Sequence, residues 1–386
     1  MNEKVNNLSD KEKEIFLQIM QQLSNSGESK TYEDLLHSDY EEMPVDIDTF
    51  LHDQRYLGKG LINDEGKFTV YPYWVDTLKK IFPDPLKPAQ YNTLALTGAI
   101  GLGKSFEAVL VGLYELHRML CLKDPYLYYG LQPIDKITFA LMNITLDAAR
   151  GVAWDKFQQL AQSSEWFMSH GTVSKSQNPQ WTPGKKIELV CGSQSRHIIG
   201  RAVFWAFFDE VSFQPNQDVE KQKEKAKTLI NTAAARMQSR FMKGEVNPTI
   251  LVLASSKRTE QSYMETFIQG KKDRESVTTL IIDEPQWVIR TDKDSPNKFQ
   301  VAVGSKYLSS EVLPLGLSEE ELEAVRNRGY KIIDVPMGYY ENFIEDIDIA
   351  LTDIAGLSTN SSNRYISGPR LVEAEDKSIQ NAFTKE

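Results

Sequence analysis

The run GAIGLGKS at residues 98–105 constrains the fold of this chain more than any other stretch. It fits the pattern G-x-x-x-x-G-K-[ST], whose glycines let the backbone curl so that successive N–H groups face phosphate oxygens. In front of it, YNTLALT at residues 91–97 predicts a short buried strand. Behind it, apolar residues recur at helical spacing from Phe106 to Leu120. This order of strand, glycine loop and helix predicts a loop that binds phosphate at a helix N-terminus.

The residue types within this phosphate loop indicate what each position would do. The loop consists of Gly98, Ala99, Ile100, Gly101, Leu102, Gly103, Lys104 and Ser105. Lys104 is expected to reach the β- and γ-phosphates of ATP, and the Ser105 hydroxyl is expected to bind Mg²⁺. The alternative is a glycine-rich turn without a ligand, and the predicted flanking strand and helix argue against it.

Composition limits the classes of partner and the cellular compartment. The formal net charge of −10 argues against a protein that coats nucleic acid with a uniformly basic surface. Local contact with DNA stays open at three basic stretches that are also typical of solvated helix faces, residues 221–227, 236–243 and 271–274. Cys121 and Cys191 lie in apolar surroundings, which predicts core thiols in a reducing compartment. The polar N-terminus predicts no signal peptide, and we expect no membrane contact because the apolar runs are short.

Alternating strand-like and helix-like segments predict an α/β fold. We expect a phosphate-loop NTPase with a mainly parallel central sheet flanked by helices, plus a smaller helical lid or linker subdomain. Strands are predicted at residues 91–97, 136–143, 185–191, 202–208, 249–254 and 277–282. The predicted division is an N-terminal helical lid-type segment at residues 1–85, the core at 86–335 and a C-terminal linker at 336–386.

A phosphate loop that supports hydrolysis needs acidic partners, and Asp209 and Glu210 are the candidates. They follow AVFWAFF, an unbroken apolar run that predicts a strand buried on both faces. Ligands of open α/β sheets bind at the carboxyl ends of the strands, where these two residues would lie. Asp209 is expected to hold Mg²⁺ through water, and Glu210 to orient and polarise the attacking water. The alternative, an ordinary polar strand end, explains less of the pattern.

Hydroxyl groups follow the next predicted strand. The run TILVLA ends in Ser255 and Ser256. Their hydroxyls are candidates for a hydrogen bond to the Glu210 carboxylate or to the γ-phosphate, which would couple the state of the nucleotide to the rest of the chain. An ordinary serine-rich strand end is the equally open alternative.

The arginine and the adenine contacts are less strongly indicated. Arginine supplies positive charge to the transition state of many such enzymes. Arg201 is the first candidate and Arg196 the second, and further options are Arg236, Arg240 and Arg258. Gln90 and Tyr91 are candidate adenine contacts, because an amide and an aromatic face suit a purine.

In their order, these motifs resemble the large subunit of tailed-phage terminases, the DNA-packaging motors. The resemblance covers most of the chain and rests on the phosphate loop, SRHIIGRAVFWAFFDE at 195–210 and TILVLASS at 249–256. FLHDQRYLGKGL and the segment Ile333–Gly356 add to it. It implies an ATPase domain that threads double-stranded DNA into an empty capsid in the cytoplasm of an infected bacterial host. It also implies a ring on the portal protein, a small terminase subunit that selects the genome, and a chain that is either in the ring or monomeric in isolation.

The same resemblance assigns roles and exposes departures. It implies that Lys104 and Ser105 bind phosphate and Mg²⁺, that Asp209 and Glu210 form the acidic pair, and that Ser255 and Ser256 belong to the coupling motif. In the family an arginine commonly precedes a glycine about ten residues before the catalytic acid. Here Ile199 precedes Gly200 and Arg201 follows it, which leaves the arginine finger open. The family's nuclease domain has no counterpart after Gly356, so we expect no nuclease activity.

Two other functions stay open at this point. One is a helicase or another nucleic-acid-stimulated ATPase, which would need further helicase motifs and a second motor domain. The other is a nucleotide-binding scaffold that assembles a complex without turnover. Glu210 argues against the scaffold, because a protein that only binds nucleotide has no need of this carboxylate.

Overall fold

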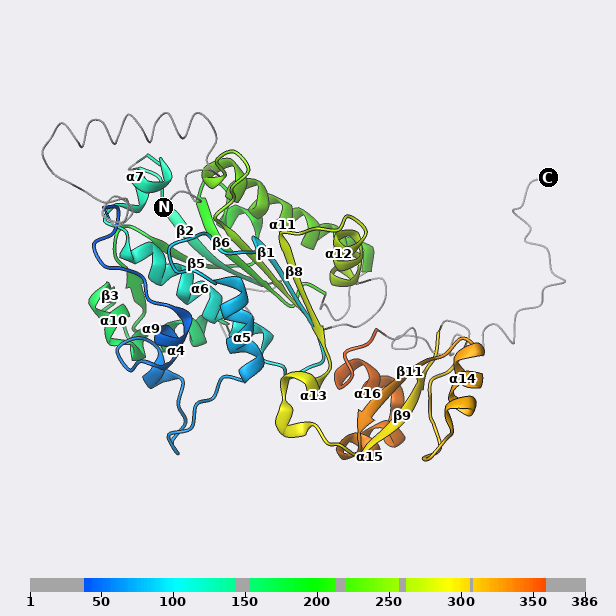
Figure 1. The fold of residues 1–386 in the computed structure, drawn as a ribbon. Helices are drawn as coiled ribbons and strands as arrows, with labels where there is room; N and C mark the ends of the chain where they lie inside the picture. The colour runs from blue at the N-terminus through cyan, green and yellow to red at the C-terminus, as the bar shows by residue number, and fades with distance from the viewer. Residues whose placement is uncertain are drawn as a thin grey trace, which may run out of the picture.

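Six parallel strands form the central sheet in the computed structural model, which describes residues 38–132, 134–143, 153–212, 219–256, 262–305 and 308–358 (Figure 1). The strands are β1 (Thr93–Gly98), β2 (Ile137–Asn143), β5 (Glu188–Gly192), β6 (Ala202–Asp209), β7 (Ile250–Ala254) and β8 (Thr279–Glu284). Their order is β5-β2-β6-β7-β1-β8, and each neighbouring pair is parallel. The predicted fold class is therefore confirmed.

The strand positions follow from burial on both faces of the sheet. Every residue of β1, β2, β6 and β7 is buried, as unbroken apolar runs predict. The strand predicted at residues 185–191 begins later than expected, at Glu188. Lys185 and Lys186 have φ angles of 53° and 58°, so the backbone cannot be extended there.

Helices cover both faces of the sheet. On one face lie α4 (Ile47–His52), α5 (Pro72–Ile81) and α6 (Lys104–Cys121), which share a core with Leu94 and Leu96 of β1. On the other face lie α11 (Val219–Phe241) and α12 (Tyr263–Lys272), which pack against Ala95 of β1 and Phe208 of β6. Alternate residues of each strand thus feed two separate cores, as the two-residue period of a strand requires.

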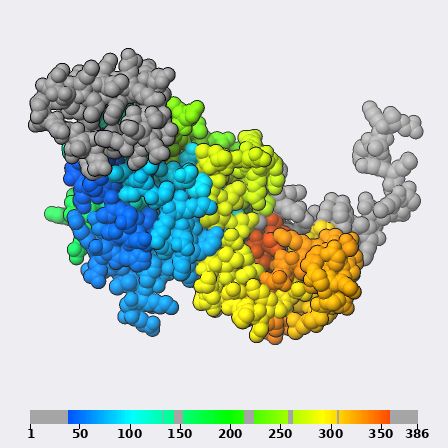
Figure 2. Space-filling model, in the orientation of Figure 1, coloured from blue at the N-terminus to red at the C-terminus, as the bar shows by residue number. Residues whose placement is uncertain are grey.

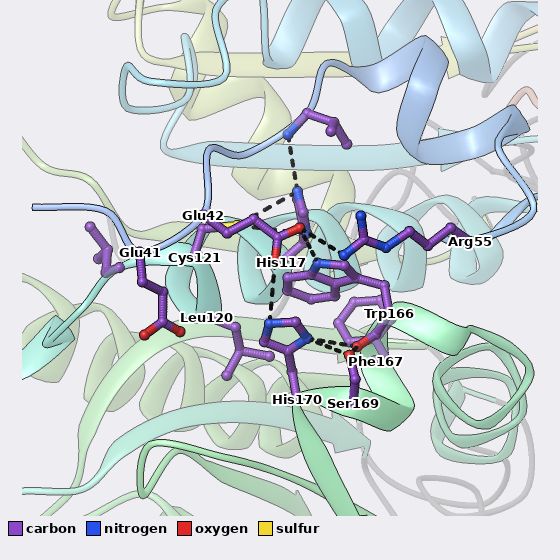
Figure 3. A network of polar contacts seen from close by, with 12 residues as sticks. Glu41, Glu42, Arg55, His117, Leu120, Cys121, Trp166, Phe167, Ser169 and His170 are labelled. Atoms are coloured by element: carbon purple, nitrogen blue, oxygen red, sulfur yellow. Dashed lines mark hydrogen bonds and ion pairs between the residues drawn. The ribbon is translucent and has the colours of Figure 1, made fainter. Parts of the chain in front are cut away.

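A polar network fastens the segment before α4 to the far end of α6 (Figure 3). The remaining elements here are α7 (Pro125–Tyr129), α9 (Asp155–Ser163), α10 (Glu165–Ser169), β3 (Gly171–Val173) and β4 (Trp181–Pro183). Glu42 accepts hydrogen bonds from Trp166 Nε1 at 2.9 Å and from Arg55 at 3.3 Å. Burial lowers the pKa of His117 to about 3, so its ring is neutral and Nε2 accepts from the Val45 N–H at 3.1 Å. The network holds the chain that precedes the sheet.

A second, smaller sheet builds what we call the C-terminal subdomain (residues 298–357). Strands β9 (Lys298–Val303), β10 (Glu311–Val312) and β11 (Lys331–Pro336) pair antiparallel in the order β10-β9-β11. Helices α14 (Glu319–Asn327), α15 (Tyr340–Glu345) and α16 (Ile347–Asp353) accompany them. Phe343 and Leu351 pack against Phe299 and Val335. In the space-filling view this subdomain is the yellow-to-red lobe beside the sheet domain (Figure 2).

The observed subdomain differs from the predicted linker. The predicted boundary between residues 335 and 336 falls inside β11, and the predicted linker contains α15 and α16. Residues 1–37 of the predicted N-terminal segment and residues 359–386 of the linker lie outside the described residues. Cys121 and Cys191 are free thiols. Within the described ranges, no helix is both long enough and apolar enough to cross a membrane.

Candidate functional site

The phosphate loop joins the carboxyl end of β1 to the N-terminus of α6. Its three glycines all have positive φ angles, 99° at Gly98, 74° at Gly101 and 85° at Gly103. At Gly98 a Cβ would also lie 2.3 Å from the carbonyl oxygen of Glu284 on β8. Both the conformation and the close approach therefore require glycine at this position.

Lys104, the first residue of α6, is buried beneath the loop and donates a hydrogen bond to the Ala99 carbonyl. Burial lowers the pKa of Lys104 to about 8, and the nearby carboxylates of Glu210, Asp209 and Asp283 act in the opposite direction. The ammonium group is still mostly protonated near pH 7. It therefore sits at the loop as a positive charge surrounded by negative ones.

Asp209 closes the site from the end of β6. Its Oδ1 accepts a hydrogen bond from Ser105 Oγ at 3.0 Å. Burial raises the pKa of Asp209 to about 6, and the neighbouring Glu210 charge raises it further, against the lowering by Ser105. A hydroxyl and a carboxylate at this distance form a hard-oxygen donor set of the kind that Mg²⁺ prefers. These two residues fit the metal that the sequence predicts.

Glu210 lies in the left-handed region, with φ of 53°, directly after β6. Hydrogen bonds on both sides hold this unfavourable conformation. Its own N–H donates to Asp209 Oδ1 at 3.1 Å, and the Val211 N–H donates to the Ala254 carbonyl at 3.2 Å. The backbone is therefore fixed where the side chain leaves the sheet.

The serines at the end of β7 hold the turn that follows Glu210. Ser255 Oγ accepts from the Ser212 N–H at 3.1 Å and donates to the Ser256 carbonyl at 3.2 Å. Ser212 Oγ in turn accepts from the Met264 N–H of α12 at 3.1 Å. Ser255 and Ser256 are both buried. The structure thus joins β6, β7 and α12 beside Glu210.

Sequence reasoning missed polar residues at the ends of two other strands. Asn143 ends β2 in register with Asp209. Asp283 and Glu284 end β8, where Asp283 is in register with Thr97 of β1. The signal was present, because TLIIDE has the same apolar run and acidic end as the strand before Glu210.

The structure places Arg201 away from the site. Arg201 precedes β6 and Asp209 ends it, so eight extended residues separate them, about 26 Å. Its guanidinium pairs with Glu188, at the beginning of β5. Arg201 therefore cannot be an arginine finger for the loop of its own chain. The second candidate, Arg196, is exposed after β5, four strands from β1.

Other options for the arginine lie elsewhere. Arg240 on α11 pairs with Asp135 at 3.4 Å, and Arg236 lies on the same helix. Arg258 is outside the described residues. None of the described candidates is shown to contact the phosphate loop.

The predicted adenine contacts are wrong for the same geometric reason. Gln90 and Tyr91 precede β1, whereas the phosphate loop follows it at the opposite edge of the sheet. From Tyr91 to Gly98 the extended chain spans about 23 Å. The Gln90 N–H donates to the Ile81 carbonyl, and the Tyr91 ring lies 5.8 Å from Lys80 Nζ. These two residues belong to the amino edge of the sheet.

Comparisons with known proteins come from family models and solved structures. A family model described as "Uncharacterized protein MJ0330, N-terminal P-loop domain" matches residues 6–305. No curated protein matches the chain. Three similar solved structures are the large terminase of bacteriophage HK97 (11% identity, TM-score 0.43, 80% of this chain and 54% of that one), that of a thermophilic bacteriophage (14%, 0.39, 75% and 53%), and the same thermophilic phage's protein in complex with ATP-gamma-S (15%, 0.30, 62% and 45%). All three are phage large terminases, the family that the sequence resembles, and the chain spans about half of their length.

Proposed function

The chain belongs to the family of the MJ0330 N-terminal P-loop domain, and from this premise we propose that it is the ATPase motor domain of a viral terminase large subunit. It would hydrolyse ATP to translocate double-stranded DNA into a procapsid. The observation that carries the ATPase proposal is the convergence of Lys104, Ser105, Asp209 and Glu210 at one edge of the sheet. A loop that only binds phosphate would not need the acidic pair.

Each of these side chains has a distinct task in the proposed reaction. Lys104 provides positive charge to the phosphates, and Ser105 and Asp209 provide oxygen ligands for the metal. Mg²⁺, when bound, neutralises charge that develops on the β- and γ-phosphates. Glu210 orients a water molecule for in-line attack and accepts its proton. The hydrogen bonds around Glu210 keep its backbone in place for this task.

The contacts around Ser212 support a route from the nucleotide to the rest of the domain. Ser212 bonds both Ser255 on β7 and the N-terminus of α12. A change at Glu210 after loss of the γ-phosphate would therefore reach both elements. This is the coupling role that the sequence assigns to Ser255 and Ser256.

The partners in this proposal are those of a packaging motor. They are double-stranded DNA, a portal protein, a small terminase subunit and further copies of the chain in a ring, within the cytoplasm of an infected bacterium. Arg201 cannot reach the loop of its own chain, so the transition-state arginine would come from another residue or from a neighbouring copy. The isolated chain should therefore hydrolyse ATP slowly.

ATP hydrolysis by the purified chain, with and without linear double-stranded DNA, tests the proposal. The wild-type protein should hydrolyse ATP in the presence of Mg²⁺, and DNA should raise the rate. Lys104→Ala and Glu210→Ala should each reduce the rate by at least about 100-fold. Glu275→Ala, which removes an exposed carboxylate remote from the loop, is the matched control and should retain the wild-type rate.

The other outcomes separate the competing functions. ATP binding without turnover would support a nucleotide-dependent scaffold. Stimulation by single-stranded DNA in preference to the duplex would favour a helicase-like ATPase. Wild-type turnover by Glu210→Ala would show that another group activates the water.

A further inference from the structure

The phosphate loop is held from outside by the C-terminal subdomain. The Ile100 N–H donates to the carbonyl oxygen of Asp353, the last residue of α16, at 2.8 Å. The Ile100 carbonyl accepts from Gln286 Nε2 at 2.9 Å. Both polar groups of the Ile100 backbone are thus bound by residues far downstream in the chain. Figure 1 shows α13 (Gln286–Ile289) and α16 below the carboxyl end of β8.

Gln286 is the centre of this junction and uses its backbone and both atoms of its amide. Its backbone N–H donates to the Ile354 carbonyl at 2.9 Å. Besides Ile100, Nε2 lies 3.4 Å from the Asp353 carbonyl, and Oε1 accepts from the Tyr339 hydroxyl at 3.2 Å. The site therefore needs a donor toward two carbonyls and an acceptor toward a hydroxyl, and glutamine supplies both.

Gly356 brings the two parts into direct backbone contact. Its φ is 67°, and a Cβ there would lie 2.5 Å from the Ala99 nitrogen and 2.8 Å from Gly98 atoms. Only glycine fits this approach without moving the phosphate loop or the subdomain. Gln286 and Gly356 therefore reach the same loop peptide from independent points of the chain.

We propose that Gln286 is a positioning residue that couples nucleotide binding at the phosphate loop to docking of the C-terminal subdomain. The inference rests on the proposed function, since it takes the loop as the nucleotide site. The peptide that the junction holds directly precedes Gly101–Ser105, the part of the loop that wraps the phosphates. Because the coupling is reciprocal, each event stabilises the conformation that the other requires.

The test measures both directions of this coupling in the full chain. One measurement is the Kd of ATPγS by calorimetry, and the other is hydrogen exchange of the Ile100 amide and residues 347–357 with and without ATPγS. Gln286→Ala should weaken binding by about tenfold, accelerate exchange at Ile100 without ligand, and abolish the ATPγS-dependent protection of residues 347–357. Gln286→Glu should behave in the same way, because a carboxylate cannot donate to the two carbonyls.

Two further variants distinguish coupling from a general loss of structure. Gly356→Ala should weaken ATPγS binding from the other side of the junction, and the double variant should lose less than the sum of the two single losses. Gln269→Ala removes an exposed side-chain amide on α12 and should leave both measurements unchanged. Thermal unfolding of each variant shows whether the fold is retained.

The outcomes also separate this inference from the proposed function. If the wild-type chain binds ATPγS and Gln286→Ala binds it equally well with the same protection pattern, the coupling role is overturned and the ATPase proposal stands. If the wild-type chain binds no ATPγS, both are overturned. Additive losses in the double variant would mean that Gln286 and Gly356 act separately, which also contradicts a single junction.

Discussion

Two strands of the central sheet, β6 and β8, lead from an apolar run into an Asp–Glu pair, and the two pairs do different things. Asp209, two strands from β1, accepts the Ser105 hydroxyl at 3.0 Å. Glu284, on the strand next to β1, accepts the Ala99 N–H through its carbonyl at 3.1 Å and the Tyr73 hydroxyl through its side chain at 3.3 Å. The same residue types thus face a possible ligand site in one case and support the loop in the other.

The difference comes from the position of each strand in the sheet. β8 lies against the loop so closely that Gly98 has no room for a Cβ beside Glu284. β7 separates β6 from β1, which leaves the width of one strand, about 4.8 Å per spacing, between the acidic pair and the loop. A ligand needs that space, so the more distant pair is the one suited to chemistry. Four predictions test this contrast.

The largest expected effect concerns the two aspartates. Asp209→Asn should lower the Mg²⁺-dependent rate of ATP hydrolysis by roughly 1,000-fold, because it removes the carboxylate beside Ser105. Asp283→Asn, its matched counterpart on β8, should change the rate far less. Initial rates measured over a range of Mg²⁺ concentrations check both. Equal losses would mean that the contrast between the pairs is not functional.

The pH dependence of stability should show the burial of Asp209. Its pKa is raised from 3.8 to about 6 by folding, so the folded state binds this proton more tightly than the unfolded state does. Stability is therefore lost as pH rises from about 4 to 6. Asp209→Asn should be more stable than wild type at pH 7.5, by up to about 3 kcal/mol, and should lose that advantage below pH 4. Urea unfolding without nucleotide or Mg²⁺ measures it, and a pH-independent difference would contradict the assignment.

The hydroxyl that binds the first pair should matter for catalysis. Ser105→Ala removes the hydrogen bond to Asp209 and one oxygen ligand for the metal. We expect a loss of roughly 10- to 100-fold in the rate of ATP hydrolysis, partly restored by raised Mg²⁺ concentration. Ser105→Thr, which keeps the hydroxyl, is the control. An alanine variant with the wild-type rate and Mg²⁺ requirement would exclude Ser105 as a ligand.

The hydroxyl that binds the second pair should matter only for stability. Tyr73→Phe removes the hydrogen bond to Glu284 and leaves the ring in place. The free energy of unfolding should fall by about 1 kcal/mol, with the ATPase rate unchanged. Urea unfolding and initial rates together check this. A large loss of rate with normal stability would bring the β8 pair into the active site.

Local patterns in the sequence predicted much of this molecule. The six parallel strands were predicted close to their observed positions because buried strands are continuous apolar runs. The loop and the Asp209–Glu210 pair could be named because both adjoin strongly patterned elements. Their approach to one another follows from parallel strands that share a carboxyl edge.

The remaining features depend on contacts between distant parts of the chain. Arg201 and Tyr91 are close in sequence to the motifs, but each lies at the opposite end of a strand from them. Gln286 and Gly356 touch the loop only because the C-terminal subdomain folds back on it. No periodicity or motif in the sequence indicates that contact. The acidic end of β8 carried a signal, and its role depends on which strand lies next to β1.

The central claim is that the β6 pair performs the chemistry, and single-turnover hydrolysis by two glutamate variants tests it most directly. Glu210→Gln and Glu284→Gln remove the same charge from the two pairs. With ATP·Mg²⁺ prebound, Glu210→Gln should retain nucleotide and cleave it at least about 1,000-fold more slowly than wild type, whereas Glu284→Gln should cleave it at close to the wild-type rate. Cleavage by Glu210→Gln at the wild-type rate, or an equal loss in both variants, would contradict the account.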